Sequence, residues 1–339
     1  MVDSGWNRGA SPFHEGELAI QERLGVRDRI DRQGRRMIRD YLIPQHRQFF
    51  AQLPYVVMGG LDELGHLWTS MLTGPPGFLS TPDEKTLCVK SPCVESSLLF
   101  DAPLSWVIRD GSDVGFLGID LSTRRRNRIN GVVSRLVEDG FEVSVRQSFG
   151  NCPQYIQARE IQAASLQQDD LTLRSASLKH DSSAMEFETL SAEDVALILK
   201  SDTFFISTAY QSDKAGLASG VDVSHRGGKP GFVRIDESHV LTVPDFSGNN
   251  HFNTFGNLVM NPQAGLLFVG FEQGDLLHLS GQAEVIWEGP DVEAYEGAER
   301  LFRFYLKRGY RNSGCLKLQW SSPEFSPYLE KTGIWSASV

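Results

Sequence analysis

The chain has few cysteines, no long apolar run and no excess of positive charge. Its 339 residues include four cysteines, at positions 88, 93, 152 and 315. They are too few and too scattered for a disulfide framework, and Cys88 and Cys93 lack a second pair at zinc-ligand spacing. The formal net charge of −10 disfavours broad binding to nucleic acid. We therefore expect no metal site and no nucleic-acid partner.

Targeting and membrane-spanning patterns are also missing. The first thirty residues carry Glu15, Glu17, Glu22, Arg23 and Arg27 and no apolar core run, so no signal peptide is predicted. Nothing approaches the roughly 20 apolar residues of a membrane span. We expect a cytoplasmic protein without membrane contact. Neither G-x-G-x-x-G nor a Walker sequence occurs, so the common nucleotide-binding folds gain no support.

What the chain does contain is an internal repeat. Segments that match about 150 to 155 positions apart are 49–55 with 204–210, 76–79 with 230–233, 87 and 89 with 241 and 243, 114–119 with 264–269, and Gly131 with Gly281. The spacing drifts by a few residues, as expected when insertions fall in loops. Two copies of one small β unit form a pseudo-dimer within the chain, so a site can lie between them. Whether whole chains also pair into homodimers stays open.

The apolar pattern predicts a mainly β (α+β) protein with peripheral helices. We divide it into a helical extension (1–45), a first β repeat (46–160), a polar linker (161–187), a second β repeat (188–290), and a C-terminal helix and tail (291–339). Short runs and close turns favour antiparallel barrels. We expect a helix start at Ser191, a short helix within 252–262, and an amphipathic helix over about 291–309.

Two neighbouring segments of the second repeat are candidates for ligand binding. In the first, Ser224, His225, Arg226 and Lys229 surround two glycines, which free the backbone to approach a phosphate. A solvated hairpin tip explains this segment equally well. The second segment directly follows a predicted strand, and its amide and hydroxyl groups suit the edge of a planar ring. Its candidates are Val243, Pro244, Asp245, Phe246, Asn249 and Asn250. An ordinary Asn- and Gly-rich turn is its alternative.

Two segments of the first repeat complete the candidates. Strand alternation places Arg126, Arg128 and Asn130 on one face, with successive side chains roughly 6–7 Å apart, a spacing that suits a phosphate. The alternative is a solvated basic face. The segment 147–157 supplies Asn151 and Gln154 and has no counterpart in the second repeat.

Catalytic groups do not stand out in the sequence. Cys152 lies in the segment 147–157, and a lone cysteine is more often buried and inert than nucleophilic. His225 and His251 are either acid–base groups or structural residues. The catalytic residues are therefore left unassigned.

Together these segments resemble the pyridoxamine 5′-phosphate oxidase-like FMN-binding split barrels, in the branch of predicted flavin-nucleotide-binding proteins. The motifs are SHRGGKPGFV (224–233), LTVPDFSGNNHFNTFGNLVMNPQAGLLFV (241–269), LLHLSGQAEVIW (276–287), GPPGFL (74–79), LGIDLSTRRRNRING (117–131) and QSFGNCPQYIQAR (147–159). The resemblance implies tandem six-stranded Greek-key split barrels with FMN at a barrel–barrel interface. It places the flavin ring along 243–246 and the phosphate near 229–234 and 248–250.

This chain departs from that family at two motifs. Gly248-Asn249-Asn250 stands where the oxidases carry a Ser-Arg-Lys phosphate loop, so Arg226, Lys229 or the arginines at 124–128 are the expected replacements. The C-terminal Arg-x-x-Pro pattern is also missing, so vitamin B6 oxidation is not expected.

The resemblance implies an FMN-dependent oxidoreductase that transfers two electrons between small molecules, with NAD(P)H as a candidate donor. The alternative is a non-catalytic protein that binds, stores or senses flavin or a related cofactor. A weaker alternative is a duplicated module with a degenerate pocket that binds a partner. Because the two repeats carry different motifs, we expect one composite site between them and not two equivalent sites.

Overall fold

The computed structural model describes residues 5–6, 8–90, 103–166, 186–236 and 238–335. The chain begins with three helices, α1 (Glu15–Arg23), α2 (Arg27–Met37) and α3 (Pro44–Gln52). His14 caps α1 by accepting a hydrogen bond from the Gly16 amide at 3.1 Å, and Glu17 accepts one from the His14 amide at 2.8 Å. This reciprocal capping fixes the start of α1 although the N-cap residue is a histidine and not Ser, Thr or Asp.

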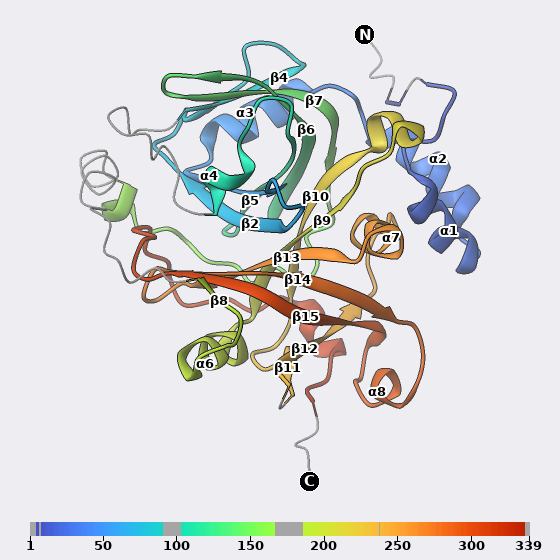
Figure 1. Ribbon diagram of the computed structural model, residues 1–339, viewed down its shortest axis with the longest axis vertical. Helices are drawn as coiled ribbons and strands as arrows, with labels where there is room; N and C mark the ends of the chain where they lie inside the picture. Colours follow the sequence, from blue (N-terminus) through green and yellow to red (C-terminus); the bar gives the residue numbers. More distant parts are fainter. Residues whose placement is uncertain (1–4, 7, 91–102, 167–185, 237, 336–339) are drawn as a thin grey trace.

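The first sheet curls into the upper barrel of Figure 1. Its strands follow the order β2-β1-β5-β6-β7-β4-β3, and neighbouring strands are antiparallel. The bounds are β1 (Tyr55–Leu61), β2 (Leu67–Thr73), β3 (Leu79–Ser80), β4 (Thr86–Lys90), β5 (Asp113–Asp120), β6 (Arg125–Val137) and β7 (Gly140–Gly150). A short helix, α4 (Leu104–Val107), precedes β5, and η1 (Ala163–Leu166) follows the barrel.

The second sheet forms the lower barrel in the order β10-β9-β13-β14-β15-β12-β11. Its strands are β9 (Thr203–Tyr210), β10 (Gly220–Gly227), β11 (Arg234–Ile235), β12 (Val240–Phe246), β13 (Gln263–Gly270), β14 (Asp275–Ile286) and β15 (Ala298–Asn312), and β8 (Glu186–Phe187) pairs with β15. The helices are α6 (Ala192–Lys200), η2 (Asp213–Ala218), α7 (Asn253–Met260), α8 (Pro290–Glu293) and η3 (Pro327–Lys331). Adding eight to each strand number of the first order gives the second order, so the two sheets have the same topology and the repeat is a duplicated barrel. The two-residue strands β3 and β11 extend each path to seven strands, one more than expected.

Local geometry confirms most of the matched segments. The strand register shifts immediately before Gly131 in β6 and immediately before Gly281 in β14. The same β-bulge therefore recurs in both barrels. Gly77 and Gly231 both have positive φ, 95° and 85°. The helix starting after Ser191 is also confirmed, with Ser191 and Asp194 forming a capping box. The predicted short helix within 252–262 is α7.

The match of 49–55 with 204–210 is wrong. Phe49 and Phe50 lie in helix α3, whereas Phe204 and Phe205 lie in strand β9. Gly59 faces Gly115 across the β1–β5 ladder, and Ser207 faces Gly265 across β9–β13, so Gly59 is the true counterpart of Ser207. A pair of phenylalanines fits a buried helix face and a buried strand alike, so composition misled the alignment.

The helix expected over 291–309 is wrong as well. Only Pro290–Glu293 is helical, and Ala298–Asn312 is strand β15. This strand hydrogen-bonds to β14 on one side and to β12 on the other. Long-range pairing on both edges therefore outweighs the local helical periodicity.

Glycines allow the two barrels to pack closely. A Cβ at Gly115 would lie 2.5 Å from the Val221 carbonyl oxygen, and one at Gly265 would lie 2.7 Å from the Leu67 carbonyl oxygen. Each barrel keeps its own apolar core, and a third cluster containing Val57, Phe205 and Leu267 lies between them. This packing brings β6 of the first barrel against β10 of the second. Among the residues described, no helix has the length and apolarity to cross a membrane. The expected linker 161–187 lies largely outside the described residues, at 167–185.

Candidate functional site

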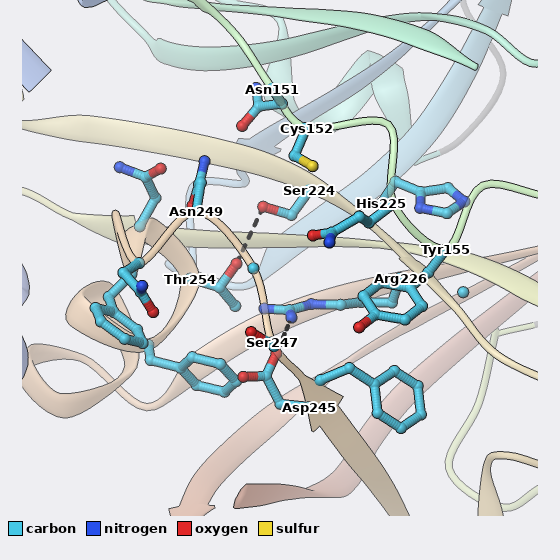
Figure 2. Close-up of a pocket in the computed structure, with 18 of the residues that line it drawn as sticks. Asn151, Cys152, Tyr155, Ser224, His225, Arg226, Asp245, Ser247, Asn249 and Thr254 are labelled. Carbon is cyan, nitrogen blue, oxygen red and sulfur yellow. Dashed lines mark hydrogen bonds and ion pairs between the residues drawn. The ribbon is translucent and has the colours of Figure 1, made fainter. Parts of the chain in front are cut away.

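A pocket opens where the two barrels meet (Figure 2). Its cavity volume is about 130 Å³, below the roughly 300–1,000 Å³ of typical ligand sites, and the rest of the hollow is open to solvent. Strand β6 and the segment 151–155 come from the first repeat, while β10, the end of β12 and the start of α7 come from the second. The predicted residues that line it are Arg126, Arg128, Asn151, Gln154, Ser224, His225, Arg226, Pro244, Asp245, Phe246, Asn249 and Asn250.

Asn130, Lys229 and Val243 are the predicted residues that do not line the pocket, and Asn130 donates a hydrogen bond to Asp222. The Lys229 ammonium group donates a hydrogen bond to the Thr332 carbonyl oxygen, so the C-terminal segment holds it away from the site. Val243 is fully buried in the core of the second barrel. The assignments of Lys229 and Val243 followed from sequence proximity to the loops. The side-chain directions, which sequence proximity does not give, place both residues outside the site.

Sequence reasoning missed several residues of the pocket. Phe252, Asn253, Thr254 and Phe255 line it from the start of α7, and Tyr155, Glu299 and Arg300 complete the wall. The signal for the first four was available, because they directly follow Asn249 and Asn250. Glu299 and Arg300 were hidden by the mistaken helix over 291–309.

Backbone strain concentrates at this pocket. Tyr155, Asn250 and Phe252 line it and have φ values of 60°, 58° and 63°, in the left-handed region that bulky residues rarely occupy. Each such residue costs on the order of 1–3 kcal/mol and persists only where the surroundings impose it. A Cβ at Gly227 would overlap the Tyr155 carbonyl oxygen, so glycine is required where the two segments cross. Such clustering is typical of functional sites.

Most charges at the pocket are paired. Arg128 lies 3.1 Å from Asp222, which also accepts a hydrogen bond from Asn130 at 2.8 Å. Arg226 forms an ion pair with Asp245, drawn as a dashed line in Figure 2. Arg300 lies 3.4 Å from Asp245 and also contacts Glu299. Burial raises the pKa of Asp245, and the two arginines oppose that rise.

Arg126 is different, because it has no carboxylate partner among the residues that the structure describes. Its Nε donates to the Cys152 carbonyl oxygen at 2.8 Å, and its Nη1 donates to the His225 carbonyl oxygen at 3.4 Å. Burial and the nearby Arg128 and Arg226 lower the pKa of Arg126 to about 9. A cation in this setting lacks a counter-charge, so the pocket is suited to an anion.

Hydroxyl and amide groups stand beside this cation. Ser224 Oγ accepts a hydrogen bond from Arg128 at 2.5 Å. It also accepts one from Thr254 at 3.0 Å, which Figure 2 marks with a dashed line. Within the described part of the chain, the Asn151 Nδ2 and Arg226 Nε donors are buried without a partner. The wall therefore holds donors that a ligand with acceptor atoms could satisfy.

The two candidate histidines pack their rings against phenylalanines. His225 offers its carbonyl oxygen to Arg126, while its ring packs edge-on against Phe205 with centroids 5.7 Å apart. Burial and neighbouring arginines lower the pKa of His225 well below its ordinary value. His251 packs its ring against Phe13 at 5.3 Å and does not line the pocket.

The equivalent position of the first barrel is apolar. Trp68 stands where the second barrel has Asp222, and Leu72 stands where it has Arg226. His278 of β14 matches Arg128 of β6. Trp68 packs against Trp106 with ring centroids 5.2 Å apart, and Trp106 packs against Tyr310 at 5.7 Å. In the portion described, aromatic rings thus replace the charged groups of the pocket.

No family model matches the chain, and no curated protein matches it. Solved structures similar to parts of it include a putative pyridoxamine 5′-phosphate oxidase from Lactobacillus delbrueckii (13% identity, TM-score 0.28, covering 37% of this chain and 97% of that one). An FAD-binding protein from Mesorhizobium loti shows 13% identity and a TM-score of 0.25, covering 39% and 99%. HutZ, a heme storage protein from Vibrio cholerae, shows 12% identity and a TM-score of 0.24, covering 41% and 98%.

The strand order found twice in this chain defines its class: tandem split β-barrels. This duplicated antiparallel architecture agrees with the tandem split barrels that the sequence motifs predicted.

Proposed function

We propose that the pocket binds FMN and that the protein is an FMN-dependent oxidoreductase. The observation that carries the proposal is Arg126, a cation at the pocket without a carboxylate partner in the described residues. A phosphate group would supply the missing counter-charge. Ser224, Thr254 and Asn249 stand at the same wall and would hold the phosphate oxygens.

The remaining wall suits a planar polar ring. Pro244, Asp245 and Phe246 end strand β12, and Asn151 and Gln154 face them from the first repeat. Tyr155 packs against Phe246 with ring centroids 5.0 Å apart, so one side of the pocket is aromatic. Such a combination of apolar surface and a few polar groups is typical of cofactor sites.

When bound, FMN would supply two-electron chemistry, and the chain's own residues would bind and orient it. The acids at the pocket, Asp245 and Glu299, are engaged by arginines. They are therefore poorly placed to give a proton. Direct hydride transfer from a donor such as NAD(P)H needs no proton donor on the protein, so this wall is compatible with that reaction.

The test is to purify the protein, record its visible spectrum, extract the cofactor, and titrate the stripped protein with FMN. We expect a yellow protein, or a stripped one that quenches flavin fluorescence on binding. A colourless preparation that takes up no FMN would refute the proposal.

Non-catalytic flavin binding is the second candidate. Asp245 and Glu299 both form ion pairs with Arg300, which leaves neither acid free to serve as a proton donor, and this favours the second candidate. Anaerobic titration of the FMN-bound protein with NADH and NADPH separates the two. Reduction followed by reoxidation on an acceptor supports the oxidoreductase. Bound flavin that stays oxidised with both donors supports storage or sensing.

A further inference from the structure

Helix α1 belongs to neither barrel, yet it packs on the helix that lines the pocket. Figure 1 shows α1 beside α7 at the edge of the barrels. At the crossing, a Cβ added to Gly16 would overlap the Gly256 carbonyl oxygen, and one added to Gly256 would lie 2.5 Å from Glu17 Cγ. Two glycines therefore let the helices touch along their backbones. This contact places Glu17 directly behind the pocket wall.

A continuous chain of hydrogen bonds runs from α1 to the pocket. Glu17 is 2% exposed, and its Oε1 accepts a hydrogen bond from Asn253 Nδ2. Asn253 Oδ1 in turn accepts one from Arg128 Nη1 at 2.7 Å. Arg128 Nη2 then donates to Ser224 Oγ at 2.5 Å. Asn253, Arg128 and Ser224 all line the pocket, whereas Glu17 does not.

The carboxyl group decides which end of the Asn253 amide meets Arg128. An asparagine side chain has a donor end and an acceptor end, and arginine has donors only. Because Glu17 accepts from the amide nitrogen, the amide oxygen is turned toward Arg128. Without that acceptor the amide can rotate and present its nitrogen to the guanidinium. Arg128 then loses one of the two partners, Asn253 and Asp222, that hold it beside Ser224. A second contact, from Gln21 Nε2 to the His251 carbonyl oxygen at 3.2 Å, holds the adjoining loop.

We infer that Glu17 is a positioning residue for the pocket, acting through Asn253 on Arg128 and Ser224. The inference rests on the proposed function for the identity of the ligand only. Burial and the nearby Asp222 raise the pKa of Glu17, whereas the His14 amide, Asn253 and Arg128 oppose that rise. A group held toward its neutral form is well replaced by glutamine, which keeps an acceptor oxygen.

The test compares Glu17→Gln with Glu17→Met. Methionine keeps the bulk at the helix crossing and removes both acceptor oxygens, including the one that accepts from the His14 amide. Glutamine keeps the bulk and one acceptor oxygen. We expect E17M to weaken FMN binding about tenfold, the value of one buried hydrogen bond to a polar network, and E17Q to stay within about threefold of wild type. Glu22→Gln is the matched control, because Glu22 lies exposed on the same helix and pairs with Arg27 at 3.1 Å.

A double variant shows whether Asn253 transmits the effect. If Glu17 acts through Asn253, E17M combined with Asn253→Ala binds FMN no more weakly than N253A alone. Additive losses, or equal affinity of E17M and wild type, would overturn the inference. If E17M does not fold, amide hydrogen exchange of the wild-type protein tests the inference independently. Ligand binding should slow the exchange in α1 (Glu15–Arg23) and leave that in α6 (Ala192–Lys200) unchanged. An unchanged exchange rate in α1 would also overturn the inference.

Running each titration with FMN and with orthophosphate separates this inference from the proposed function. Binding of phosphate but not FMN by wild type removes the flavin proposal, and the Glu17 comparison is then decided on phosphate affinity. Binding of FMN with no difference between E17M and E17Q removes the positioning role alone. Binding of neither ligand removes both.

Discussion

Replacing Arg126 by methionine should make the ligand-free protein more stable and the FMN-bound protein less so. Burial and the nearby Arg128 and Arg226 lower the pKa of Arg126 from its ordinary value to about 9. For a base with a lowered pKa, this penalty is fully present below pH 9 and is relieved only as the pH rises from there toward the ordinary pKa of arginine. At pH 7 the folded protein therefore bears the whole penalty.

The size of the effect follows from that shift. One pKa unit corresponds to about 1.4 kcal/mol, which gives an upper bound of about 5 kcal/mol. The Arg126 side chain is partly exposed, so solvent screening reduces the gain to on the order of 1–3 kcal/mol. A charge-assisted hydrogen bond to phosphate contributes about 1.5–3 kcal/mol, so FMN affinity should fall roughly 10- to 150-fold.

The assay is thermal unfolding of wild type and R126M, each with and without saturating FMN, together with a binding titration. The melting temperature of R126M should be higher without ligand and lower with it. Arg125→Met is the matched control, because Arg125 neighbours Arg126 and instead lies over the Phe49 ring, 4.5 Å from its centroid. A ligand-free R126M that is less stable than wild type, or that binds FMN equally well, would refute the reasoning.

Three further predictions concern other parts of the molecule. Gly227→Ala should destabilise the protein by about 1–3 kcal/mol and weaken FMN binding, because its Cβ would overlap the Tyr155 carbonyl oxygen, whereas Gly9→Ala, with open space around it, should do neither. FMN should bind at one equivalent per chain by titration, since Trp68 and His278 occupy the positions equivalent to Asp222 and Arg128, and two equivalents would contradict this. Burial lowers the pKa of His278 to about 4, so its contribution to stability should be lost as the pH falls from 6.5 toward 4, by about 2 kcal/mol between pH 7.5 and 5. His278→Gln should flatten that part of the denaturation profile, and an unchanged pH dependence would count against it.

The pocket residues that the sequence revealed lie in segments of unusual composition. Asn249 and Asn250 follow strand β12 in a glycine- and asparagine-rich loop, and Ser224 and Arg226 lie at the end of strand β10, next to Gly227 and Gly228. Arg126 was found by strand alternation, which predicted that Arg126, Arg128 and Asn130 share a face. The structure confirms that shared face, because Arg128 and Asn130 both bond to Asp222 and Arg126 joins Arg128 in the pocket wall.

Residues brought in by long-range pairing could not be found in this way. Arg300 enters the pocket because β15 pairs with β12 in a register that places Arg300 opposite Asp245. Local periodicity had indicated a helix there. Glu17 lies 236 positions from Asn253 along the chain, and only the glycine crossing of α1 and α7 joins them.

The sequence by itself determined the duplicated β architecture, the asymmetry between the two repeats and most of the loops around the pocket. These properties depend on side-chain periodicity and turn chemistry, which act over a few residues. The tertiary structure decided which arginine has no carboxylate partner in the described chain. It also placed helix α1 against α7, behind the pocket, and filled the equivalent site with aromatic rings. Charge pairing and burial depend on distances between segments far apart in the chain, and those distances are set only when the two barrels pack.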